Sequence, residues 1–150
     1  MSETAVQAKD AKRALPDGWR WVKLSDLLVC MESGSRPKGG AVGVNSGVPS
    51  ISAEHMTPHG TFDFTIQRYV PCEYYENMPS GHIRQGDILI VKDGATTGKT
   101  CFVDDSWPFL EAVVNEHVFI CRADRQKILP RLLFYWLWGG TGQHDIRTCF

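Results

Sequence analysis

The residues that most suggest chemistry lie near position 98, where Gly98, Lys99 and Thr100 follow one another. A Gly-Lys-Ser/Thr triplet ends the phosphate-binding loop of nucleotide hydrolases, whose backbone N–H groups and lysine hold the phosphates. The motif G-x-x-x-x-G-K-[ST] requires its first glycine at position 93, where the sequence has Asp93, a carboxylate that would face the phosphate. The spacing therefore argues against a nucleotide hydrolase.

The sequence on either side of this triplet favours two β-strands. A phosphate loop must lead into a helix, because the helix N-terminus supplies the positive end of the dipole. Thr100, Phe102 and Val103 are β-branched or aromatic instead, which is typical of a strand. Residues 88–91 are apolar throughout, and Asp93-Gly94 is a strong turn signal. We therefore expect a hairpin whose loop presents small polar residues.

Two other patterns are compatible with metal or nuclease chemistry, and both are weak. His55 and His59 have the spacing of helical metal ligands, but the proline and glycine around them predict a loop without a third ligand. Lys92 and Asp93 resemble half of a nuclease site, but no paired acidic motif accompanies them. We therefore expect no metal, no cofactor and no catalytic residue.

Length and composition favour one domain of ordinary globular type. The chain has 150 residues, of which we expect 1–14 to form a flexible leader and 15–150 a single domain. The net charge of −1 does not indicate a nucleic-acid partner, although a local basic patch would suffice. Five scattered cysteines fit neither a disulfide framework nor a zinc site, and they indicate the cytoplasm. No apolar segment reaches the length that spans a bilayer.

The elements that must position these residues are short strands and helices. In the first half of the chain we expect a strand near 19–22, a helix capped by Ser25, a loop over 32–49 and strands near 50–56 and 65–70. In the second half we expect a helix with Pro71 at its first position, the hairpin, a strand over 113–121 and a helix over 128–138. The final stretch, residues 140–150, shows neither a cap nor a closing strand.

The helix expected over 128–138 is apolar around its whole circumference. The stripe expected to face the core comprises Leu129, Leu132, Leu133, Trp136 and Leu137. The opposite face carries Phe134, Tyr135 and Trp138, which are the candidate partner interface. From the sequence alone, this second face fits a buried core and a partner surface equally well.

The order of these segments resembles a target recognition domain of the specificity subunit of type I restriction–modification systems. The resemblance runs from residue 15 to about residue 146, and it is most specific in "LPDGWRWVKLSDLL" and "GDILIVKDGATTGKT". It implies an α/β (α+β) fold with a twisted, partly curled, mainly antiparallel sheet and short flanking helices. A specificity subunit normally holds two such domains separated by long helices, whereas this sequence presents one domain and no following spacer helix.

The resemblance also implies a function without chemistry in this chain. The protein would bind double-stranded DNA and direct the methyltransferase and restriction subunits of a type I system. The alternative is a truncated or regulatory half-subunit. It would act as a protein-interaction module, through a methyltransferase or self-association, with little DNA affinity alone.

Two glycine-rich loops and one isolated arginine offer side chains suited to phosphates and base edges. The candidates are Ser35, Arg36 and Lys38 in the first loop, Lys92, Thr96, Thr97 and Lys99 in the second, and Arg68, with His55 and Gln67 as weaker ones. The acidic residues Asp104, Asp105, Glu111 and Glu116 are expected to lie away from the duplex, because like charge near phosphate is unfavourable. Asp87 and Asp93 are expected to fix turns.

Overall fold

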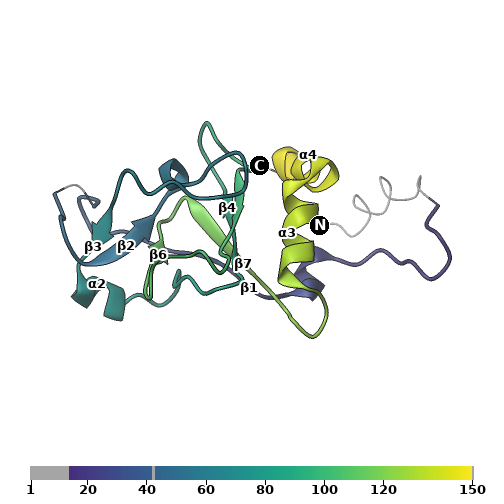
Figure 1. Ribbon diagram of the computed structural model, residues 1–150, viewed down its shortest axis with the longest axis horizontal. Helices are drawn as coiled ribbons and strands as arrows, with labels where there is room; N and C mark the ends of the chain where they lie inside the picture. The colour runs from purple at the N-terminus through teal and green to yellow at the C-terminus, as the bar shows by residue number, and fades with distance from the viewer. Residues whose placement is uncertain (1–13, 42, 150) are drawn as a thin grey trace.

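The computed structural model describes residues 14–41 and 43–149, so the expected leader lies outside the described residues except for Ala14. Its strands form two sheets (Figure 1). The first has the order β1-β7-β4-β5 and comprises β1 (Leu28–Ser33), β7 (Val118–Ala123), β4 (Ile88–Val91) and β5 (Thr100–Phe102). The second has the order β3-β2-β6 and comprises β3 (Tyr69–Val70), β2 (Val48–Ile51) and β6 (Val113–Val114).

Short helices flank the two sheets. They are the 3-10 helices η1 (Leu24–Leu27) and η2 (Ala53–His55) and the α-helices α2 (Cys72–Glu76), α3 (Pro130–Trp138) and α4 (Gly140–Cys149). In Figure 1, α3 and α4 lie beside the first sheet, whereas α2 lies with the second sheet at the opposite end. All pairings are antiparallel except that of β2 with β6. The expected α+β class with mainly antiparallel pairing is therefore confirmed, with the strands divided between two sheets.

The predicted hairpin is confirmed as β4 and β5. The two strands pair antiparallel, with Leu89 opposite Cys101, and all of β4 is buried. Gly98 has a φ of 87°, a conformation that favours glycine, and its N–H donates to the Val91 carbonyl (2.8 Å). Because the chain continues from Thr100 as a strand and not as a helix, no helix N-terminus is available here for a phosphate.

Helix α3 was predicted correctly, but its orientation was not. Pro130 opens it, and Leu133, Phe134 and Leu137 are its buried residues. The Phe134 ring packs against that of Phe102, with centroids 5.4 Å apart, so the prediction of Phe134 as a partner contact was wrong. Of the stripe expected in the core, Leu129, Leu132 and Trp136 are instead exposed.

Several other elements differ from expectation because pairing partners lie far away in the sequence. Residues 19–22 form no strand, and the predicted helix capped by Ser25 is only η1, after which the chain becomes β1 because it pairs with β7. The strand expected over 113–121 is split into β6 and β7. The strand expected near 65–70 is only β3, Pro71 caps α2 from outside, and α4 was not predicted.

Candidate nucleic-acid interface

An open cleft of about 840 Å³ lies between the first glycine-rich loop, β2 and the turn from β6 to β7. It is lined by Ser35, Arg36, Pro37, Gly39, Gly40, Ala41, Ser50, Ser52, Glu54, Arg68, Asn115 and Glu116. The cleft thus brings together three of the predicted site residues, Ser35, Arg36 and Arg68. It does not include Lys38 or any candidate from the second loop.

Each cleft arginine is bonded to a carboxylate, which is exposed for Glu54 and half-buried for Glu116. Arg36 Nε lies 2.5 Å from Glu116 Oε1, and the side chain of Arg36 is 49% exposed. Arg68 Nε donates to Glu54 Oε1 (3.1 Å), and the Ser52 hydroxyl donates to the same oxygen (3.2 Å). The hydrogen bond from Arg68 lowers the pKa of Glu54 below its usual value. A guanidinium has further N–H groups for an anion or a base edge, so both arginines keep donors that a ligand can use.

Glu116 lies where the sequence did not predict an acid. It was expected to lie away from the duplex, but it lines the cleft and forms an ion pair with Arg36, one of the candidate DNA-contact residues. Its Oε1 also lies 3.3 Å from His117 Nε2, and His117 Nδ1 lies 2.6 Å from Asp93 Oδ1. Asp93 begins the loop between β4 and β5, so this chain of contacts joins the cleft to the second glycine-rich loop.

The predicted residues of the second loop mostly make internal contacts. Lys99 Nζ donates to the Ala53 carbonyl (3.0 Å), and the Thr97 hydroxyl donates to the Gly94 carbonyl (2.7 Å). Lys92 Nζ lies 5.1 Å from the centre of the Phe119 ring. These contacts stabilise the loop and its attachment to η2.

The remaining candidates divide into exposed and engaged side chains, with Thr96 and Lys38 exposed. The Ser35 hydroxyl is hydrogen-bonded to the Tyr74 hydroxyl (2.7 Å). His55 is buried, its Nδ1 accepts a hydrogen bond from the Ser52 N–H, and burial lowers its pKa. As a weaker candidate for DNA contact, His55 is therefore excluded, whereas Gln67 stays exposed.

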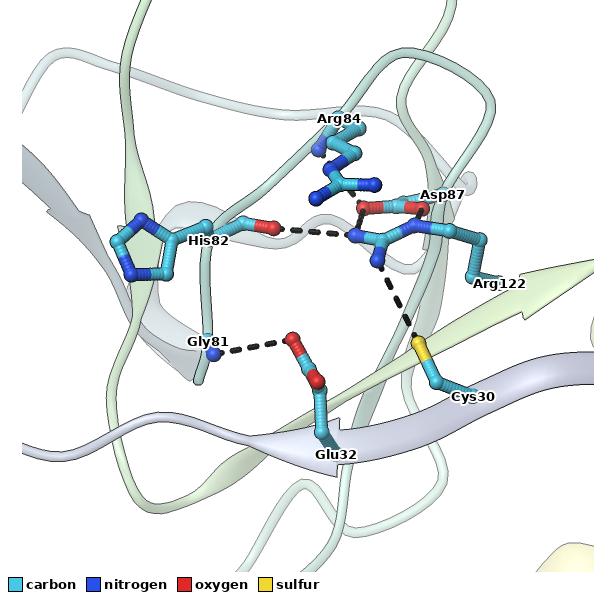
Figure 2. Close-up of polar contacts among 7 residues, drawn as sticks. All are labelled: Cys30, Glu32, Gly81, His82, Arg84, Asp87 and Arg122. Atoms are coloured by element: carbon cyan, nitrogen blue, oxygen red, sulfur yellow. Dashed lines mark hydrogen bonds and ion pairs between the residues drawn. The ribbon is translucent and has the colours of Figure 1, made fainter. Parts of the chain in front are cut away.

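A cluster of polar contacts around Asp87 and Arg122 lies outside the cleft and is structural (Figure 2). Asp87 is 1% exposed. Its carboxylate accepts two hydrogen bonds from Arg122, from Nε to Oδ1 (2.8 Å) and from Nη2 to Oδ2 (2.9 Å). The Arg84 N–H also donates to Asp87 (2.7 Å), which confirms that Asp87 fixes a turn. Arg122 further donates to the His82 carbonyl and to Cys30 Sγ.

The pKa shifts in this cluster agree with a structural role. Burial raises the pKa of the Asp87 carboxyl, although Arg122 opposes the shift, and the hydrogen bonds to Asp87 raise the pKa of Arg122. Burial likewise raises the pKa of the Cys30 thiol, which disfavours the nucleophilic thiolate. The cluster joins β1 and β7 to the turn before β4.

Neither a metal-binding group nor a membrane span is found in residues 14–41 and 43–149. No three His, Cys, Asp or Glu residues in these ranges are placed to hold a metal ion. No helix there is both long enough and apolar enough to cross a bilayer.

Comparison with known proteins places this geometry on a known fold. No protein-family model matches the sequence, and no curated protein does. The crystal structure of the HsdS subunit from Thermoanaerobacter tengcongensis matches with a TM-score of 0.62 and 20% identity, over 93% of this chain and 31% of that one. A chain from a structure of type I R-M complex assembly matches with a TM-score of 0.60 and 21% identity, over 89% of this chain and 31% of that one.

The chain has the fold of part of an HsdS subunit. This confirms the fold that the sequence resemblance implied. This chain spans less than a third of the length of each solved chain that it matches. At this level of identity, the comparison shows the shared fold, and the cleft residues must be judged on their own chemistry.

Sequence reasoning missed the carboxylates and the uncharged polar residues on the walls of the cleft. These residues are Ser50, Ser52, Glu54, Asn115 and Glu116. One signal was present, because the polar triplet at 115–117 interrupts the apolar run for which the sequence predicts one strand. The pairing of residue 116 with residue 36 had no local signal.

Proposed function

We propose that this chain is a DNA target recognition domain of a type I restriction–modification specificity subunit, itself without catalytic activity. The observation that carries the proposal is the HsdS-like fold over 93% of the chain. In this proposal the cleft contacts double-stranded DNA, and the partners are the methyltransferase and restriction subunits of a cytoplasmic type I system. Residues 15–150 are proposed to be one recognition domain.

The chemistry of the cleft supports DNA as the ligand. Arginine presents a planar fork of donors that matches phosphate oxygens and the acceptor edge of guanine. Arg36 and Arg68 line one cleft and are both about half exposed. Serine and asparagine groups on the same walls offer further hydrogen bonds to base edges and to the sugar–phosphate backbone. Exposed Lys38 follows in the same loop and adds positive charge beside the cleft.

The experiment is an equilibrium titration of the protein with duplex DNA of random sequence at increasing salt. Binding should weaken as salt rises, because each phosphate contact releases counterions. Arg36→Ala should weaken binding, whereas Arg125→Ala removes an exposed arginine that does not line the cleft and should leave affinity nearly unchanged. Absence of binding by the unaltered protein even at low salt would contradict the proposal.

A second candidate function is a protein-interaction module, as a regulatory half-subunit. It is favoured by the apolar face of α3, where Leu129 is 70% exposed and Leu132 is 58% exposed. The predicted partner residues Tyr135 and Trp138 belong to the same helix, and Trp138 Nε1 donates to the Pro58 carbonyl. This function predicts a stable complex with a methyltransferase subunit or with a second copy on gel filtration, and little affinity for DNA.

A further inference from the structure

Glu116 combines features that the ion pair with Arg36 does not explain. Its Oε1 is shared by Arg36 and His117. Its Oε2 is buried and has no hydrogen-bond partner among the described residues. A buried acceptor without a donor is unfavourable, and most such groups in proteins are paired. The carboxylate therefore has unused acceptor capacity in a cleft proposed to meet DNA.

The backbone around Glu116 is fixed on both sides. The Asn115 N–H donates to the Ile51 carbonyl (3.0 Å), and its Oδ1 accepts the His117 N–H (3.0 Å). The His117 ring is in turn held by Asp93. A side chain that recognises a base must be held in a defined position by neighbouring hydrogen bonds such as these, because sequence specificity depends on that position.

The partner of Glu116 is held less firmly. Arg36 is about half exposed and lies on the loop between β1 and β2, which contains glycines at 39 and 40. An exposed ion pair is worth little, because water and salt screen both charges. A phosphate or a guanine edge can therefore compete with Glu116 for Arg36, and that exchange would leave the carboxylate in need of a donor.

The chemistry of DNA restricts which donor can serve. In the major groove, the exocyclic amino groups of cytosine (N4) and adenine (N6) are donors, whereas guanine N7 and O6, thymine O4 and phosphate oxygens are acceptors. A carboxylate left facing only acceptors would be repelled, so wrong sequences would be penalised as well as right ones favoured.

We propose that Glu116 is a specificity-determining residue that accepts a hydrogen bond from the exocyclic amino group of a cytosine or adenine when Arg36 turns to the DNA. This inference rests on the proposed function, and it names the base chemistry that the cleft reads. The proposal explains why a carboxylate lies in a surface that binds DNA, where positive charge alone would serve to hold phosphates.

The test begins with selection of bound sequences from a random duplex library. The unaltered protein, Glu116→Ala and Glu116→Met are compared, with Glu76→Ala as the control, since Glu76 is exposed and does not line the cleft. The unaltered protein and the control should enrich a motif with one position restricted to cytosine or adenine. Both Glu116 variants should relax that position, and the methionine variant retains side-chain length if the alanine variant folds poorly.

A second step removes the amino group from the DNA. Cytosine at the restricted position is replaced by 2-pyrimidinone, or adenine by purine. The unaltered protein should lose roughly ten- to a hundredfold in affinity, as expected for a hydrogen bond to a charged group. The Glu116 variants should show no such loss. The protein change and the DNA change together form a double-mutant cycle, which isolates the contact between Glu116 and the amino group.

The outcomes separate this inference from the proposed function. Glu116 variants that enrich the same motif, or that lose the same factor on the analogue, would overturn the inference alone. Duplex binding without any sequence preference would overturn the inference and would also contradict target recognition in the proposed function. A protein that binds no duplex at all would overturn the proposed function together with the inference.

Discussion

Two regions of the molecule use the same residue types for different ends. In the buried cluster, Asp87 is 1% exposed and its carboxylate receives two bonds from Arg122 and one from the backbone. In the cleft, the guanidinium groups of Arg36 and Arg68, which are about half exposed, are bonded through Nε to the carboxylates of Glu116 and Glu54. The buried pair of Asp87 and Arg122 directs its hydrogen bonds to groups of the fold, whereas the cleft pairs keep guanidinium donors and one carboxylate oxygen for a ligand.

The two regions meet at the base of the cleft loop. Glu32 in the buried cluster accepts the Gly81 N–H (3.1 Å). A Cβ at Gly81 would lie 2.5 Å from the Gly34 Cα, so these two backbones are in close contact. Gly34 begins the loop that carries Arg36, and its N–H donates to the Asn115 carbonyl. The buried cluster therefore positions the loop that the cleft uses.

The largest expected effect comes from removing one partner of the buried pair. Arg122→Met leaves the Asp87 carboxylate buried without its charge partner, which should lower the free energy of unfolding by about 3–5 kcal/mol. The matched change Arg36→Met breaks an exposed pair and should cost at most about 1 kcal/mol. Denaturant titrations of both variants make the comparison. Equal losses would show that the two regions do not differ as described.

The next effect concerns the junction of the two regions. In Gly34→Ala, the new Cβ would lie 1.7 Å from the Val114 carbonyl oxygen, so the backbone must shift. We expect a loss of about 1–3 kcal/mol in the free energy of unfolding and weaker DNA binding, since the cleft loop moves. Gly140→Ala, where the Cβ meets nothing within 4 Å, is the control. A lower stability with unchanged DNA affinity would show that the position of the loop does not determine DNA binding in the cleft.

A third effect should appear in binding but not in stability. Arg68→Met should weaken DNA binding by about 1–3 kcal/mol if the guanidinium contacts a base edge. Its thermal midpoint should stay within the range of the Arg125→Met control, because the pair with Glu54 is exposed. Fluorescence anisotropy with labelled duplex and thermal melting give the two readouts. A variant that loses stability but keeps its affinity would assign Arg68 to the scaffold.

The smallest effect is a pH dependence of the open pair. The pKa of Glu54 is lowered in the folded chain by its bond to Arg68, so the pair contributes stability above the unfolded pKa of about 4.3. That contribution is lost as pH falls through the lowered folded pKa. The small stability difference between the unaltered protein and Arg68→Met should therefore vanish at low pH. A difference that grows on acidification would have the wrong sign.

The sequence predicted best where the signals were local. The hairpin of β4 and β5 follows from a buried apolar run and an Asp-Gly turn, so both strands and the absence of a phosphate loop were predicted correctly. Helix α3 also carries its own start and stop signals in Pro130 and Gly139. Its rotation was not predicted, because the whole surface of the helix is apolar and the contact of Phe134 with Phe102 decides it.

Features that depend on distant residues were missed. Strand β1 pairs with β7, which lies far away in the sequence, and that pairing overrides the helix signal at Ser25. In the candidate site, Arg36 and Arg68 could be predicted from residue type alone. Their carboxylate partners could not, because the pairing of Arg36 with Glu116 depends on the tertiary fold.

The proposed function requires the half-exposed arginines of the cleft to bind DNA. The decisive measurement is the salt dependence of duplex affinity for the unaltered protein and for the Arg36→Ala, Arg68→Ala double variant. If both arginines contact phosphates, the slope of log affinity against log salt should become shallower by about 0.9 for each contact removed. An unchanged slope and affinity in the double variant would contradict the account.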